Sequence, residues 1–104
     1  MAVVELTLIP IGTESTSCSP YVAAAYDAVK DNDKVEIRLN PMGTVLEGDI
    51  DELFACVRKM QEAVFESGAD RVYSVVKIDD RRDKKGNLDQ KINSVMDKVM
   101  NSEK

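Results

Sequence analysis

The stretch PMGTVLEGD, residues 41–49, lies between an alternating apolar segment at 34–39 and the most regular amphipathic pattern of the chain. Its first four residues echo Pro-Ile-Gly-Thr at 10–13, which also follows an apolar segment. Proline ends strand pairing because it lacks a backbone N–H, and glycine permits a close approach of another backbone. The two Pro-x-Gly-Thr corners therefore predict chain reversals at two strand ends. They are either simple turns or places where amides and a hydroxyl hold a small polar molecule.

The segments around these corners predict seven secondary-structure elements. Ser19 followed by Pro20 is typical of a helix start, with Ser as the N-cap. Residues 49–52 resemble a capping box, and Gly68 marks the end of the helix that follows. The expected order is β-α-β-β-α-β-α, with strands over 3–9, 34–39, 44–47 and 71–78 and helices over 19–30, 49–67 and 88–100.

The first six elements have the order of a ferredoxin-like domain. We therefore expect one α+β domain over 1–104, with a four-stranded antiparallel sheet in the order 4-1-3-2 and an extra C-terminal helix. Right-handed crossovers place the first two helices on one face of that sheet. The other face has no cover within the chain, and the strand over 71–79 carries apolar residues on both faces. This pattern predicts burial between subunits, in a dimer or a dimer of dimers.

Composition excludes several classes of chemistry. The 104 residues include no histidine and two cysteines, so a Ser-His-Asp triad, a histidine-ligated zinc and a four-thiolate metal site are all excluded. The net charge of −5 without a basic stripe argues against a nucleic-acid partner. The N-terminus does not resemble a secretory signal, and no apolar run approaches the roughly 20 residues of a membrane span. We expect a cytoplasmic protein with reduced thiols, no metal and no membrane partner.

Two polar stretches are candidates for ligand binding. The loop at 13–19 carries hydroxyls and ends at a helix N-terminus, where free amides attract anions. It is alternatively a capped loop with spare hydroxyls. Met42, Gly43, Thr44 and Glu47 offer a thioether, a backbone patch, a hydroxyl and a carboxylate, which suit a flat heterocycle. Glu47 is alternatively a solvated charge at a strand end.

The charged run at 79–83 and the two cysteines are weaker candidates. Opposite charges this close together usually neutralise one another at the surface, although arginine also binds phosphate or a neighbouring subunit. Cys18 precedes a helix N-terminus, where the pKa of a thiol tends to fall. Cys56 lies within a helical pattern and is expected to be a packing residue.

Four motifs in order resemble the small thiamine-binding, YkoF-like family of ferredoxin-like proteins. They are Pro-Ile-Gly-Thr at 10–13, Ser-x-Ser-x-Tyr-Val-Ala at 17–23, Pro-Met-Gly-Thr-x-x-Glu-Gly at 41–48 and Lys-Ile-Asp-x-Arg-x-Asp-Lys at 77–84. The resemblance covers roughly residues 3–99. It implies a binding protein and not an enzyme, a ligand that is thiamine or its hydroxymethylpyrimidine portion, no cofactor, and a homo-oligomer.

The expected strand order suggests where such a ligand would bind. Strand one neighbours strand three in antiparallel fashion, so both Pro-x-Gly-Thr corners are expected at one end of the sheet with the loop at 13–19 above them. The candidate ligand-binding residues are Gly12, Thr13, Ser17, Ser19, Met42, Gly43, Thr44 and Glu47. Asp79, Arg81 and Arg82 are expected at the opposite end and are second-tier or interface residues.

Two other functions remain open from the sequence. One is an enzyme acting on a thiamine-related precursor, with Asp79 or Glu47 as base and Arg81 as clamp. The other is a structural or regulatory oligomer in which the corners only shape an interface.

Overall fold

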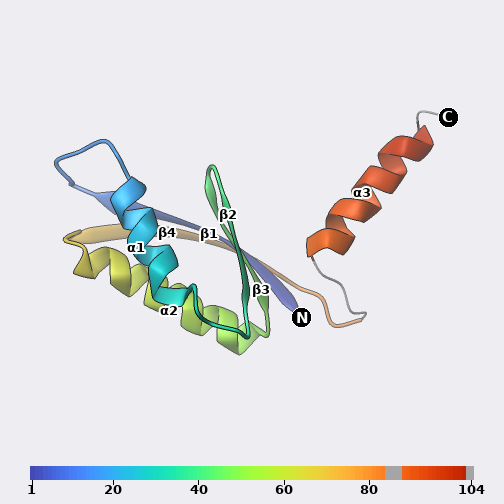
Figure 1. Ribbon diagram of the computed structural model, residues 1–104, viewed down its shortest axis with the longest axis horizontal. Coiled ribbons are helices and arrows are strands. Elements are labelled where there is room, and N and C mark those ends of the chain that lie inside the picture. The colour runs from blue at the N-terminus through green and yellow to red at the C-terminus, as the bar shows by residue number, and fades with distance from the viewer. Residues whose placement is uncertain (84–87, 103–104) are drawn as a thin grey trace.

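The structure, a computed structural model, describes the backbone of residues 1–83 and 88–102 and the side chains of 1–83 and 92–100. Seven elements follow one another in the predicted order (Figure 1). They are β1 (Ala2–Ile11), α1 (Ser19–Val29), β2 (Glu36–Asn40), β3 (Gly43–Gly48), α2 (Ile50–Glu66), β4 (Arg71–Asp80) and α3 (Leu88–Ser102).

The four strands form one antiparallel sheet in the order β2-β3-β1-β4. Counted from the β4 edge, this is the order 4-1-3-2 expected from the sequence. Strand β1 pairs with β4 over its whole length, from Ala2 opposite Asp80 to Ile11 opposite Arg71. Its pairing with β3 ends earlier, at Leu6 opposite Thr44. The last five residues of β1 therefore have β4 on one side and no β3 residue on the other.

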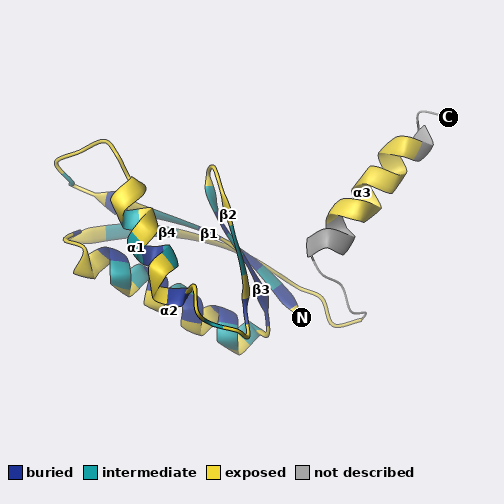
Figure 2. Ribbon diagram, viewed as in Figure 1, coloured by how far each residue is buried: buried dark blue, intermediate teal, exposed yellow. Residues whose placement is uncertain are grey.

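Helices α1 and α2 lie side by side on one face of the sheet, as Figure 1 shows and as predicted. The core forms between them and the strands, where apolar residues at every second strand position meet the buried stripe of α2. Leu6, Leu46 and Leu53 are almost fully buried there, as is Met60. In Figure 2 the buried residues gather in the sheet and the two helices that cover it.

The two covering helices begin in different ways. Helix α2 is capped by Asp49, whose carboxylate accepts a hydrogen bond from the N–H of Asp51 at 3.3 Å. Helix α1 begins at Ser19, one residue earlier than an N-cap at Ser19 requires. Its cap is Cys18, whose carbonyl oxygen accepts hydrogen bonds from Tyr21 and Val22. The Ser19 cap predicted from the sequence is therefore wrong, because the following Pro20 is compatible with either of the first two helical positions.

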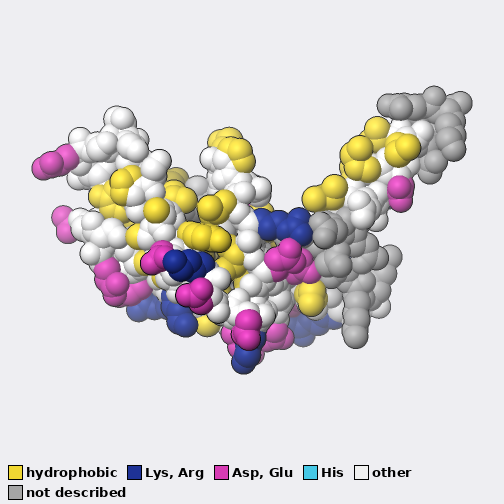
Figure 3. Space-filling model, in the orientation of Figure 1, with side chains coloured by type: hydrophobic (Ala, Val, Ile, Leu, Met, Phe, Trp, Pro, Cys, Tyr) yellow, Lys and Arg dark blue, Asp and Glu magenta, His cyan; other side chains and the backbone are white. Residues whose placement is uncertain are grey.

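Helix α3 stands apart from the α/β body in Figure 1. The apolar side chains described between residues 92 and 100 are exposed, and Figure 3 shows them at the surface. They are Ile92, Val95, Met96, Val99 and Met100. No helix among the residues that the structure describes has the length and apolarity needed to cross a membrane.

Candidate functional site

The corner at Pro41 and Met42 is a two-residue turn that joins β2 to β3, with Asn40 opposite Gly43. The Thr7 hydroxyl of β1 donates a hydrogen bond to the carbonyl oxygen of Met42 at 3.2 Å. A Cβ atom at Gly43 would lie 3.2 Å from both the Leu6 carbonyl oxygen and the Thr7 hydroxyl oxygen. Glycine is needed here because β1 approaches this closely.

A pocket of about 240 Å³ opens beside this corner, and we call it the hairpin pocket. It lies where β1 continues past the start of β3, and α1 and Met60 of α2 complete its wall. Its lining is mostly apolar, with Thr7, Thr44 (6% exposed), Asn40 and the Cys18 thiol as polar groups. The lining residues are Leu6, Thr7, Leu8, Ile9, Cys18, Val22, Ala25, Asn40, Pro41, Met42, Gly43, Thr44 and Met60.

This lining suits a small, flat and mostly apolar molecule. Pockets for drug-sized ligands occupy roughly 300–1,000 Å³, so a smaller volume fits a molecule built on a single ring. Leu8, Val22 and Met60 can pack on the faces of such a ring. The hydroxyl of Thr44 and the amide of Asn40 can bond to donors and acceptors on its edge.

The corner at Pro10 to Thr13 borders a different cavity, which we call the loop pocket and which has a volume of about 480 Å³. Gly12 has φ +81°, a left-handed conformation that favours glycine, and it turns the chain out of β1. The hydroxyls of the loop are partly used within it. Thr13 Oγ1 donates to the Ser15 carbonyl oxygen at 2.9 Å, and Ser15 Oγ accepts from the Ser17 N–H at 3.0 Å.

The lining of the loop pocket comes from three segments. They are the end of β1 with the loop after it, the start of α1, and the turn between α2 and β4. The residues are Ile11, Gly12, Thr13, Glu14, Ser15, Ser17, Pro20, Tyr21, Ser67, Gly68, Ala69 and Asp70.

The prediction that the two corners face each other is wrong. Strand β1 was expected to end at residue 9, but it continues to Ile11 along β4, whereas β3 begins opposite Leu6. At about 3.4 Å per residue, Ile11 lies roughly 17 Å beyond Leu6. Gly12, Thr13 and Ser17 consequently line the loop pocket, and Met42, Gly43 and Thr44 line the hairpin pocket.

Ser19 and Glu47 are not among the residues that line the hairpin pocket. Ser19 lines a shallow depression over α1, next to Cys18 and Pro41. Strand alternation turns Glu47 to the opposite face of the sheet from Leu46, with Val3 and Glu36 as its cross-strand neighbours. The grouping of Glu47 with Thr44 is therefore wrong. Glu47 is also only 6% exposed, so the alternative interpretation as a solvated strand-end charge is wrong as well.

Comparisons with known proteins identify the family. A sequence profile of the family described as "Thiamine-binding protein" matches residues 4–96. The chain belongs to this family. It is 50% identical over 102 residues to a UPF0045 protein of Methanothermobacter thermautotrophicus, with 95% of this chain and 100% of the relative covered. It is 44% identical over 98 residues to the UPF0045 protein YqgV of Bacillus subtilis, with 91% and 94% covered.

A crystal structure supports the fold of this thiamine-binding family member. The hypothetical protein MJ1052 from Methanocaldococcus jannaschii superposes with a TM-score of 0.81 at 37% sequence identity. The match covers 90% of this chain and 94% of that one. The resemblance seen in the sequence motifs is therefore confirmed at the level of family and of fold.

The charged run lies at the far end of the sheet from Thr44, as expected, because Asp79 pairs with Val3 at the start of β1. Its arginines form local ion pairs, Arg81 with Asp83 at 2.6 Å and Arg82 with Asp80 at 2.8 Å. The hydrogen bond from Arg82 lowers the pKa of Asp80. The neutralising role expected for this run is confirmed for these two pairs.

The two cysteines differ in their surroundings. Both are free thiols, and Cys18 is exposed at the rim of the hairpin pocket. Cys56 is buried as expected, and its Sγ accepts a hydrogen bond from the Asn32 amide at 3.4 Å. Burial raises the pKa of the Cys56 thiol. In the part of the chain that the structure describes, no cluster of acidic or thiol side chains is suited to a metal ion.

Sequence reasoning missed several residues of the hairpin pocket in this thiamine-binding family member. Asn40, Leu8 and Met60 were not among the candidate ligand-binding residues. The relevant signal was present in the pattern of β1, whose alternation runs into residues that β3 does not cover.

Proposed function

We propose that this protein binds thiamine or its hydroxymethylpyrimidine portion in the hairpin pocket, without catalysis, in carriage, buffering or sensing. One observation carries the proposal: the pocket joins Met42, Gly43 and Thr44 of the family-like motif to an apolar wall of the size of one ring. The family description supports the ligand class. We further propose a cytoplasmic homo-oligomer that needs no cofactor.

The chemistry of an aminopyrimidine fits this lining. Its ring faces are apolar and would pack against Val22 and Met60. Its amino group and ring nitrogens need acceptors and donors, which the Thr44 hydroxyl and the Asn40 amide supply. The net charge of −5 also favours the approach of a thiazolium cation over that of an anion.

Binding without catalysis agrees with the type of polar group in the lining. Apart from the Cys18 thiol at the rim, the polar groups of the lining are hydroxyls, an amide and a thioether, which form hydrogen bonds and dispersion contacts but do not ionise near neutral pH. The hypothesis of an enzyme with Asp79 or Glu47 as base requires carboxylates at the ligand. Asp79 lies at the other end of the sheet and Glu47 on its other face.

Calorimetric titration with thiamine, thiamine diphosphate and hydroxymethylpyrimidine tests the proposal. Thr44→Val keeps the side-chain shape and deletes the hydroxyl, so it is expected to weaken binding by about 0.5–1.5 kcal/mol, roughly 2- to 12-fold. Ser17→Ala, which deletes a hydroxyl from the loop pocket, is the matched control and should leave the affinity unchanged.

Three outcomes would contradict the proposal. Loss of affinity in Ser17→Ala with none in Thr44→Val would place the ligand in the loop pocket. Absence of heat with all three ligands would favour a structural role. Conversion of any of them, seen by chromatography of the same samples, would favour an enzyme.

A further inference from the structure

The side chain of Cys18 lies where two cavities of the molecule meet. It lines both the hairpin pocket and the shallow depression over α1. Among the described residues, the two linings share two others, Val22 one turn later on α1 and Pro41 of the hairpin turn. The exposed thiol therefore stands at an opening between α1 and the hairpin turn. Of the three shared side chains, only the thiol of Cys18 can form a covalent bond under mild conditions.

The backbone of Cys18 is held in place, whereas its thiol is available. Cys18 caps α1, and its carbonyl oxygen accepts hydrogen bonds from the N–H groups of Tyr21 and Val22, both at 3.0 Å. The side chain makes no capping hydrogen bond. The other of the two cysteines of the chain, Cys56, is buried. A reagent dissolved in water therefore reaches the thiol of Cys18 and not that of Cys56 in the folded protein.

A buried hydroxyl indicates that the pocket behind this thiol holds a molecule. Thr44 lines the hairpin pocket and is only 6% exposed. Its hydroxyl has no hydrogen-bond partner among the residues that the structure describes. Buried hydroxyls in proteins are nearly always hydrogen-bonded, so a bound molecule would supply the missing partner. A group that closes the opening at Cys18 would keep that molecule away from Thr44.

We propose that Cys18 is a site of reversible S-thiolation by a low-molecular-weight disulfide of the glutathione disulfide class, and that the adduct closes the hairpin pocket. The thiolate of Cys18 attacks one sulfur of the disulfide. A bond forms between Cys18 Sγ and that sulfur while the bond between the two sulfurs of the reagent breaks. The other half leaves as a thiolate and takes up the proton that Cys18 gave up. The reverse exchange with a free thiol restores Cys18.

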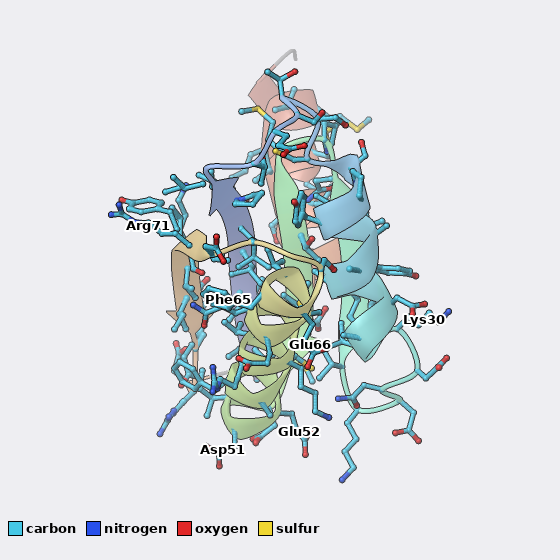
Figure 4. The ribbon with its side chains drawn as sticks, turned by 90° about the vertical axis from the view of Figure 1, so that its left-hand side faces the viewer. Lys30, Asp51, Glu52, Phe65, Glu66 and Arg71 are labelled. Atoms are coloured by element: carbon cyan, nitrogen blue, oxygen red, sulfur yellow. The ribbon has the colours of Figure 1, made fainter. Side chains whose placement is uncertain are left out.

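The two cavities suit the two occupants differently. The hairpin pocket, of about 240 Å³ and mostly apolar, suits a single ring and not a charged tripeptide. The depression over α1 has a volume of about 660 Å³ and includes the polar side chains of Ser19, Asp27 and Lys30. Figure 4 shows Lys30 projecting outward at the last turn of α1. A glutathionyl group bonded to Cys18 therefore lies in the depression and across the opening, with the pocket closed behind it.

The adduct and the ligand of the hairpin pocket should oppose each other. This part of the inference rests on the proposed function. Coupling between two binding events is reciprocal, so each weakens the other by the same factor. If the adduct lowers the affinity for the ligand about tenfold or more, saturating ligand lowers the equilibrium constant of S-thiolation by that factor. The ratio of disulfide to thiol in the surroundings then sets how much of the protein can bind its ligand.

Glutathione disulfide and hydroxymethylpyrimidine provide the first test. Peptide mass spectrometry should find the glutathionyl group on Cys18 and none in Cys18→Ser. Calorimetry should show an affinity about tenfold or more lower for the adduct, with recovery after dithiothreitol. The matched control is Ser17→Cys in the Cys18→Ser background, because residue 17 lines the loop pocket, and its adduct should leave the affinity unchanged. Modification of Cys56 in place of Cys18, an unchanged affinity of the Cys18 adduct, or an equal loss in the control would overturn the proposal.

The position of the adduct provides a second test that needs no ligand. If the unmodified protein binds no hydroxymethylpyrimidine, the proposed function fails, and the adduct is still judged by what it contacts. In a ¹³C-labelled protein that carries an unlabelled glutathionyl group, isotope-filtered NOEs should join that group to Val22 on α1 and to Pro41 across the opening. NOEs confined to the loop at 13–17 would show an open pocket and would overturn the proposal.

Discussion

Replacement of Gly43 by alanine is the sharpest test of how the hairpin corner is built. The added Cβ would lie 3.2 Å from the Leu6 carbonyl oxygen and 3.2 Å from Thr7 Oγ1. Both contacts are shorter than an ordinary van der Waals separation of about 3.5 Å. The carbonyl belongs to the paired part of β1, and the hydroxyl is held by its hydrogen bond to Met42. Neither atom can move without loss of an existing interaction.

Two opposing effects set the change in the free energy of unfolding that Gly43→Ala is expected to cause. Insertion of a methyl group into a filled site costs about 1–3 kcal/mol. Alanine also reduces the conformational entropy of the unfolded chain, which favours the variant by about 0.4–1 kcal/mol. The net expectation for Gly43→Ala is a loss of roughly 1–2 kcal/mol in the free energy of unfolding. For a domain of this size that lowers the melting temperature by about 5–10 °C.

Thermal unfolding of four proteins tests this expectation: wild type, Gly43→Ala, Thr7→Ala and the combined variant. Truncation of Thr7 removes one of the two close contacts, so Gly43→Ala should cost less in that background than in the wild type. A melting temperature for Gly43→Ala at or above that of the wild type would refute the reasoning. Strict additivity of the two substitutions would show that the Thr7 hydroxyl does not limit the space at Gly43.

Two further predictions concern titratable groups. The exposed Cys18 should react with iodoacetamide in the native protein much faster than the buried Cys56. A ligand in the hairpin pocket should slow the reaction of Cys18. Equal reaction rates for both thiols, measured by mass spectrometry, would contradict the burial of Cys56. The pKa of Asp80 is lowered in the folded chain by Arg82, so this pair contributes stability above the unfolded-state pKa of Asp80 and loses it as the pH falls through the folded-state value. Arg82→Gln should therefore raise the pKa of Asp80 in a carboxyl NMR titration, and an unchanged midpoint would show that the pair does not form in solution.

Most of the fold was predictable because the local signals and the topology agree. The capping residue Asp49 and the terminal Gly68 act locally and are found where the pattern placed them. The alternation at 34–39 also locates a strand, which the structure bounds at Glu36–Asn40. The β-α-β-β-α-β order then leaves few antiparallel arrangements. When local signals and topology agree in this way, the fold can be predicted from the sequence.

The candidate site was predictable only in part, because it depends on where strand pairing ends. The sequence shows that Gly12 and Gly43 both follow strands, but the last residue of β1 that pairs with β3 is set by tertiary contacts. That register separates Gly12 from Thr44 by several residues of β1 that pair with β4 but not with β3, and it creates the hairpin pocket in the gap. Glu47 was misplaced for a simpler reason, since strand alternation turns it away from Leu46 and from the helix-covered face.

A crystal structure of the protein with hydroxymethylpyrimidine tests the central claim most directly. The account predicts density for one flat ring in the hairpin pocket, with a ring substituent within hydrogen-bonding distance of the Thr44 hydroxyl and the ring face against Met60. Density between Gly12, Ser17 and Gly68 with an empty hairpin pocket would contradict it.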